Sequence, residues 1–96
     1  VTAHIFSLGF EWAYNNEIDV ISNSWTFDQM HSTYIRVRIE KLLRDGRDGK
    51  GIVIVFATGN ANHAVSFPAN CNDSIIAVGA IDITTNRANF PIMVKN

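Results

Sequence analysis

The strongest structural signal in this chain is the stretch Gly51-Ile52-Val53-Ile54-Val55-Phe56-Ala57-Thr58-Gly59-Asn60. Its apolar part, Ile52 to Ala57, is continuous instead of alternating with polar residues. Such a run is typical of a parallel strand that is covered on both faces. Because ligands in open parallel sheets bind beyond the carboxyl ends of the strands, the polar residues that follow at once are candidates for a site.

Two further strands are predicted around this run. Ahead of it lies Ile18-Asp19-Val20-Ile21-Ser22-Asn23-Ser24-Trp25, a short β-branched segment that passes into a polar end. After it, beyond a polar loop, lies the apolar segment Ser74-Ile75-Ile76-Ala77-Val78-Gly79-Ala80. The glycine-rich stretch Asp45-Gly46-Arg47-Asp48-Gly49-Lys50-Gly51 is predicted to be a tight loop.

Two helices are predicted from apolar residues that recur with helical spacing. The first lies near the start of the chain and is expected to end at Asn15-Asn16, because asparagine tolerates the left-handed conformation of a helix end. The second spans about Ser32 to Arg44. The apolar faces consist of Ile5, Leu8, Trp12 and Ala13 in the first helix and of Ile35, Ile39, Leu42 and Leu43 in the second.

The predicted order is therefore helix, strand, helix, strand, loop, strand. Alternating helices and buried strands indicate an α/β fold with a mainly parallel, doubly wound sheet and right-handed crossovers. Two helices barely suffice to cover both faces and both edges of such a sheet. We therefore interpret residues 1–96 as one partial domain, a slice of a larger α/β domain.

Composition excludes several classes of function. The net charge is -1, so no basic excess indicates nucleic acid or an anionic membrane as a partner. Although 47% of the residues are hydrophobic, the apolar runs are too short to span a bilayer. The single cysteine, Cys71, excludes an internal disulfide framework and a cysteine-rich zinc site. The histidines are isolated and lack the spacing of metal ligands.

Small polar residues follow the first two predicted strands. They are Asn23-Ser24-Trp25-Thr26 after the first strand and Thr58-Gly59-Asn60-Ala61-Asn62-His63 after the second. Because one right-handed crossover joins these strands, the two segments are expected side by side. On spacing alone, the simpler interpretation is that Gly59 and Asn60 only make a turn. No Gly-x-Ser-x-Gly elbow is present, so a self-contained Ser-His-Asp triad is not predicted.

Several segments together resemble subtilisin-like serine proteases. Residues 10–25 are similar to the helix-then-strand segment of that family, and residues 51–60 to its apolar strand that ends in the Gly-Asn of the oxyanion hole. The match continues in the same order through Ser66-Phe67-Pro68-Ala69-Asn70, Ile75-Ile76-Ala77-Val78-Gly79-Ala80-Ile81-Asp82 and Arg87-Ala88-Asn89-Phe90. The resemblance implies a three-layer α/β fold, with helices on both faces of a mainly parallel sheet.

The resemblance also implies roles for particular residues. Asn60 would be the oxyanion-hole donor, with its side-chain amide aimed at the charge that develops on the scissile carbonyl oxygen. The S1 pocket, which holds the substrate side chain next to the scissile bond, would be lined by Ser24, Trp25 and Thr26 on one wall and by Ala57, Thr58 and Gly59 on the other. The family usually has glycine where Thr26 stands, and Trp25 is larger than the usual residue at its position.

The family's catalytic Asp, His and Ser motifs do not occur in this sequence. The family's order would place the Asp and His before Val1 and the Ser after Asn96. We therefore expect peptide-bond hydrolysis from the parent protein and none from the isolated chain. The implied partners are a polypeptide substrate and the remainder of the peptidase domain. The alternative is a non-catalytic α/β binding or assembly module that keeps the scaffold.

No cofactor is identifiable from these residues. The resemblance makes calcium possible in the parent protein, but no run of acidic ligands in this sequence forms a calcium site. The resemblance also implies a secreted or extracytoplasmic location, with which a single cysteine is compatible.

Overall fold

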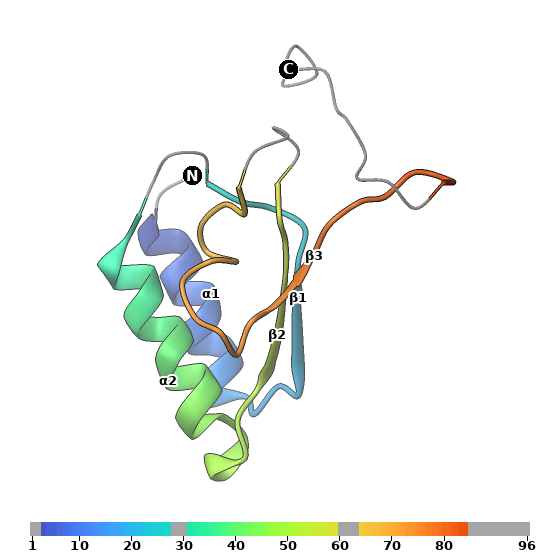
Figure 1. Cartoon of the computed structure of the whole chain (residues 1–96). Coiled ribbons are helices and arrows are strands. Elements are labelled where there is room, and N and C mark those ends of the chain that lie inside the picture. Colours follow the sequence, from blue (N-terminus) through green and yellow to red (C-terminus); the bar gives the residue numbers. More distant parts are fainter. Residues whose placement is uncertain (1–2, 28–30, 60–63, 85–96) are drawn as a thin grey trace.

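Two helices pack on a small parallel sheet in the computed structural model, which describes residues 3–27, 31–59 and 64–84 (Figure 1). In chain order the elements are α1 (Ala3–Asn15), β1 (Val20–Asn23), α2 (Thr33–Gly49), β2 (Val53–Ala57) and β3 (Ile76–Val78). The α/β class and the order of elements that the sequence predicted are confirmed.

The described sheet has three parallel strands in the order β1-β2-β3. Val20 pairs with Val53 near the start of the strands, and Asn23 pairs with Phe56 where β1 ends. On the other side of β2, Ala57 pairs with Val78. The carboxyl ends of the strands therefore meet at one edge of the sheet, where the sequence placed the polar segments.

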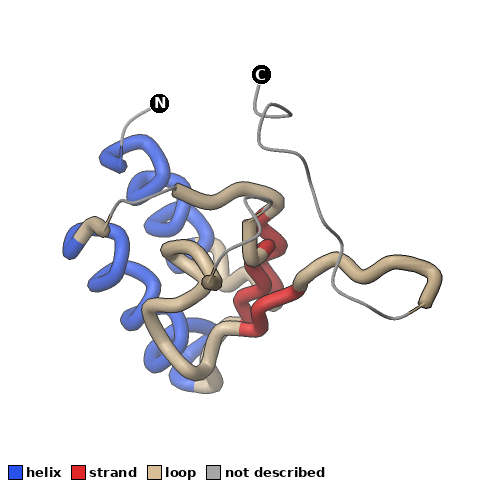
Figure 2. Tube along the Cα trace, turned by 45° about the horizontal axis from the view of Figure 1, so that its top comes forward, coloured by secondary structure: helices blue, strands red, loops and turns tan. Residues whose placement is uncertain are grey.

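Both helices cover the same face of the sheet. They pack against each other and lie on one side of the strands in both views (Figures 1 and 2). Between the helices and the sheet, Ile35 and Ile39 of α2 and Ile54 and Phe56 of β2 are completely buried. Burial contributes about 1.5–3 kcal/mol for each such side chain, so the main hydrophobic core lies in this layer.

The opposite face of the sheet is open within the described ranges. Val20, Val53, Ile76 and Val78 are 55%, 42%, 51% and 53% exposed. On β2, exposed Val53 alternates with buried Ile54 and Phe56, so it points away from the helices. The sequence predicted that both faces of the sheet are covered, and within the described residues the helices cover one face. An apolar second face agrees with a slice of a three-layer domain.

Helix α1 buries a different face from the one expected. Ile5, Leu8 and Trp12 are 56%, 49% and 61% exposed. Of the expected face only Ala13 is buried, and the helix also buries Phe10, which that face did not include. The helix is thus apolar on two sides, and periodicity alone does not show which side this part of the fold uses.

Polar contacts tie the two helices together. The hydroxyl of Ser7 on α1 is buried and accepts a hydrogen bond from Nε of Arg38 on α2, at 3.1 Å. The same guanidinium forms an ion pair with Glu11, at 2.8 Å between Arg38 Nη2 and Glu11 Oε1. These contacts connect α1 directly to α2.

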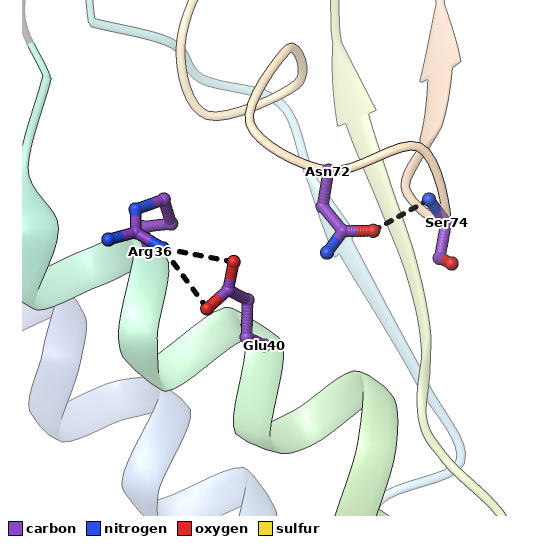
Figure 3. A network of polar contacts seen from close by, with 4 residues as sticks. All are labelled: Arg36, Glu40, Asn72 and Ser74. Atoms are coloured by element: carbon purple, nitrogen blue, oxygen red, sulfur yellow. Dashed lines mark hydrogen bonds and ion pairs between the residues drawn. The ribbon is translucent and has the colours of Figure 1, made fainter.

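Local contacts define the start of α2 and the turn before β3. The Ser32 side chain caps α2 by accepting from the backbone N–H of Ile35, and Arg36 pairs with Glu40 one turn along the helix (Figure 3). Ahead of β3, Oδ1 of Asn72 accepts from the backbone N–H of Ser74 at 2.8 Å (Figure 3). Asx turns of this kind reverse the chain without help from other elements.

The glycine-rich segment predicted as a loop forms an irregular extension of α2. Its backbone leaves helical geometry from Gly46 to Asp48, with φ of 54° at Arg47 and 58° at Asp48. Two left-handed non-glycine residues in a row are uncommon. The Arg47 side chain forms an ion pair with Asp19, with 2.9 Å between Arg47 Nε and Asp19 Oδ1, and donates to the carbonyl of Gly51 at 3.3 Å.

Candidate functional site

The two polar segments begin side by side at the carboxyl edge of the sheet. Because Asn23 pairs with Phe56, Ser24 follows β1 directly beside Ala57, the last residue of β2. The buried Asn23 side chain strengthens this junction, since its Nδ2 donates to the carbonyl of Val55 at 3.1 Å. The predicted walls of the groove therefore start from adjacent strands.

The segments also meet further out, at Gly59. The backbone φ of Gly59 is +97°, a conformation that L residues rarely adopt. A Cβ placed on Gly59 would lie 2.9 Å from Oγ of Ser66 and 3.6 Å from Oγ1 of Thr26. Gly59 thus brings the second segment against Thr26 of the first. The predicted proximity of the two segments is confirmed as far as Gly59, and Asn60 lies outside the described residues, as does His63.

A third segment, residues 66 and 67, is hydrogen-bonded to both polar segments or their immediate neighbours. The backbone N–H of Ser66 donates to the carbonyl of Thr58 at 3.1 Å, and that of Phe27 donates to the carbonyl of Phe67 at 2.8 Å. Thr58 in turn donates to Val78 on β3 at 3.1 Å. Residues 66 and 67 therefore link the segment after β1 to the segment after β2, and the three segments are joined by hydrogen bonds.

Comparison with known proteins assigns this arrangement to a family. The model of the subtilase family matches residues 1–91. The chain belongs to the subtilase family. It is similar to subtilisin DY of Bacillus licheniformis, with 38% identity that covers 85% of this chain and 29% of that protein.

Other relatives give the same picture of this subtilase segment. Subtilisin E of Bacillus subtilis is 34% identical over 85% of this chain and 21% of its own length. The calcium-dependent protease of Trichormus variabilis is 34% identical over 84% of this chain and 15% of its own length. The chain thus spans less than a third of each of these three relatives.

In this subtilase segment, Trp25 is anchored in an aromatic cluster. Its half-buried ring stacks on Phe6 of α1, with 4.1 Å between centroids, and meets Phe56 edge-on at 5.0 Å and Phe27 at 5.4 Å. Such contacts add about 0.5–1.5 kcal/mol each beyond area burial. Trp25 therefore anchors the polar segment after β1 to α1, a contact that the sequence did not indicate.

Ser66 is a residue that the sequence pattern did not indicate, and it lies against Gly59. Its side chain is buried, and its Oγ has no hydrogen-bond partner. The spacing of residues in the sequence does not predict the burial of Ser66, because a serine seven residues after Gly59 has no special meaning. The one available signal was its position at the head of the family-like stretch Ser66-Phe67-Pro68-Ala69-Asn70.

The described part of the site is polar but uncharged. Its side chains offer hydroxyl groups, from Ser24, Thr26, Thr58 and Ser66, and no acid–base pair. Burial raises the pKa of the Cys71 thiol, which disfavours the thiolate and agrees with its interpretation as a structural residue. Chemically, these groups can orient a peptide by hydrogen bonds, and proton transfer requires residues from elsewhere.

Two further properties concern the described ranges as a whole. They contain no cluster of three or more His, Cys, Asp or Glu side chains that could hold a metal ion. Neither helix there combines the length and apolar character that crossing a bilayer requires. Arg87 to Phe90, the last family-like piece, lies outside the described residues.

Proposed function

We propose that this chain is the part of a subtilisin-like serine endopeptidase that supplies the oxyanion-hole donor and part of the S1 groove. The observation that carries the proposal is the meeting of three segments at the carboxyl edge of the sheet. Gly59 lies against Thr26 and Ser66, and the walls start from paired strands. A groove between such segments suits an extended peptide, which adds to the protein as a further strand.

In this proposal Asn60, the residue after Gly59, donates from its side-chain amide to the oxyanion of the tetrahedral intermediate. A donor placed for the tetrahedral oxyanion contacts the planar ground-state carbonyl less well, so it lowers the barrier more than it strengthens substrate binding. Ser24, Trp25 and Thr26 form one wall of the S1 pocket. Ala57, Thr58 and Gly59 form the other wall.

The nucleophile and the proton-transfer groups come from the remainder of the peptidase domain in this proposal. A Ser-His-Asp triad there attacks the scissile carbonyl, forms an acyl-enzyme and passes the serine proton to the leaving amine. The same remainder covers the open apolar face of the sheet and the exposed stripe Ile5, Leu8 and Trp12 on α1. The isolated chain is then inactive, because it provides binding groups without a nucleophile.

The proposal also concerns calcium binding by this chain and the cellular location of the parent protein. One relative is named a calcium-dependent protease, but the described residues of this chain lack a suitable cluster of ligands. We place the parent protein outside the cytoplasm, as the resemblance to subtilisins implies.

The test compares the full-length protein with the isolated chain on a peptide substrate that releases a chromophore. The full-length protein should hydrolyse the peptide and lose this activity after reaction with a serine-directed fluorophosphonate, whereas the isolated chain should be inactive. Absence of hydrolysis and of fluorophosphonate labelling in the full-length protein would instead support the alternative, a non-catalytic module on the same scaffold.

A further inference from the structure

One asparagine outside the proposed groove lies in the sequence pattern of an acceptor for N-linked sugar. Asn72 is followed by Asp73 and Ser74, which matches Asn-x-Ser/Thr with a residue other than proline in the middle. No other asparagine before Asn96 is followed two residues later by serine or threonine. In a secreted protein this pattern indicates a glycosylated surface loop, so the placement and conformation of Asn72 decide whether the pattern can be used.

The loop that carries Asn72 lies at the surface between two anchored ends. Ala69 and Ile75, which flank it, are 5% and 7% exposed and belong to the hydrophobic core. Between them Asn72 is half-buried, and the next two residues, Asp73 and Ser74, are exposed. The backbone N–H of Ile75 donates to the carbonyl of Asn72 at 3.2 Å, which helps to hold the shape of the loop. A large group attached to this loop can therefore extend into solvent without displacing the core.

The side-chain amide of Asn72 is engaged at its oxygen and free at its nitrogen. Its Oδ1 accepts from the backbone N–H of Ser74 at 2.8 Å, so an Asx turn brings together the two residues that define the motif (Figure 3). Its Nδ2 donates no hydrogen bond to any described residue. Within the described ranges the only buried side-chain oxygen or nitrogen without a partner is Oγ of Ser66, so Nδ2 of Asn72 is in reach of solvent.

Asn70, in the same loop, differs from Asn72 in both respects. Its Nδ2 donates to the carbonyl of Val65 at 3.1 Å. The residue two positions after it is another asparagine instead of serine or threonine. One asparagine of the loop thus uses its amide nitrogen to hold the backbone, while the other leaves its amide nitrogen available.

We propose that Asn72 is a site of N-linked glycosylation, whose Nδ2 accepts an oligosaccharide in the secretory pathway. A bond forms between Nδ2 and C1 of the first sugar, and the bond between C1 and the diphosphate of a lipid-linked oligosaccharide donor breaks. The amide nitrogen loses one proton and the lipid diphosphate leaves, so the transfer needs no oxidant or reductant. This inference rests on the extracytoplasmic location in the proposed function, because the modification takes place on secreted proteins.

The test uses the full-length protein, produced from its complete coding sequence in eukaryotic host cells and purified from the culture medium. Treatment with a peptide N-glycosidase in heavy-oxygen water hydrolyses the bond between sugar and asparagine and leaves an aspartate that carries one heavy oxygen atom. Mass spectrometry of the peptide that contains position 72 should detect this label in the wild type. The label should be absent when the glycosidase is omitted.

Two substitutions at Ser74 separate the modification motif from the turn. Ser74→Ala keeps the backbone N–H that bonds to Asn72 Oδ1 but removes the hydroxyl group that the motif requires, so the label should be lost. Because Ser74 is exposed, this variant should fold as the wild type does. Ser74→Thr preserves the motif and should keep the label. Asn70→Gln, the matched control in the same loop, should also keep it.

The outcomes separate this inference from the proposed function. Label at Asn72 in the wild type and Ser74→Thr, and none in Ser74→Ala, supports the glycosylation site whether or not the protein hydrolyses peptides. A secreted protein that reacts with a serine-directed fluorophosphonate but carries no sugar at Asn72 overturns the inference, while the peptidase assignment stands. If the protein stays in the cytoplasm of the host and Asn72 is unmodified, the proposed location and this inference fail together.

Discussion

Replacing Gly59 with alanine should destabilise the site for two separable reasons. The first is conformational, because a φ of +97° is unfavourable for alanine. Residues held in such regions cost about 1–3 kcal/mol. The second is steric, because the new Cβ would lie 2.9 Å from Ser66 Oγ. Relieving the contact by shifting a serine side chain should cost about 1 kcal/mol, at the low end of overpacking effects.

Gly49→Ala isolates the conformational contribution. Gly49 has a similar φ of +88°, but a Cβ there would meet no atom within 4 Å. In urea-induced unfolding of the full-length protein, both variants should therefore lose stability. Gly59→Ala should lose about 1 kcal/mol more than Gly49→Ala, the cost of the contact with Ser66.

A double variant identifies the atom responsible. In Ser66→Ala the Oγ is absent and Cβ of residue 66 remains 3.5 Å from the new methyl group, which is an ordinary contact. The double variant should therefore lose about 1 kcal/mol less stability than the sum of the two single losses. This difference is the coupling free energy between residues 59 and 66. Equal losses in Gly59→Ala and Gly49→Ala, with no recovery in the double variant, would refute the packing of Gly59 on Ser66.

Three further predictions concern stability and reactivity. Ile76→Ala should destabilise the full-length protein by about 2 kcal/mol or more if the remaining domain covers Ile76, which is half exposed in this chain. A change of less than about 0.5 kcal/mol would show that this sheet face stays open. The isolated chain should self-associate or unfold with weak cooperativity, and a sharp, concentration-independent transition of a proven monomer would contradict this. Burial raises the pKa of Cys71, so in the full-length protein iodoacetamide should alkylate this thiol more slowly at pH 8 than it alkylates free cysteine. The alkylation rate should increase at higher pH. A rate at pH 8 equal to that of free cysteine would show the thiol to be unperturbed.

The parts of the fold that were predictable are those set by local sequence. The continuous apolar run from Ile52 predicted a buried parallel strand, and β2 occupies Val53–Ala57. Once helices and strands alternate, right-handed crossovers bring the strand ends to one edge. The proximity of Thr26 and Gly59 followed from that rule, without knowledge of any side-chain contact.

What the sequence could not predict depends on contacts between distant residues. Helix α1 is apolar on two sides, so the choice of Phe10 and not Trp12 for the core is made by packing against α2 and the sheet. The left-handed backbone at Arg47 is accompanied by an ion pair with Asp19, which is remote in sequence. The unpaired hydroxyl of Ser66 likewise results from the folding of its loop against Gly59.

Measuring the kcat of Asn60→Ala in the full-length protein shows whether Asn60 is the oxyanion donor. We expect kcat to fall by roughly 10²–10³ with little change in KM, a range established on subtilisin itself and adopted here through the resemblance. Asn62→Ala, two residues away, should cost far less. If the two variants proved equally mild, Gly59 and Asn60 would form only a turn, and the oxyanion assignment would be wrong.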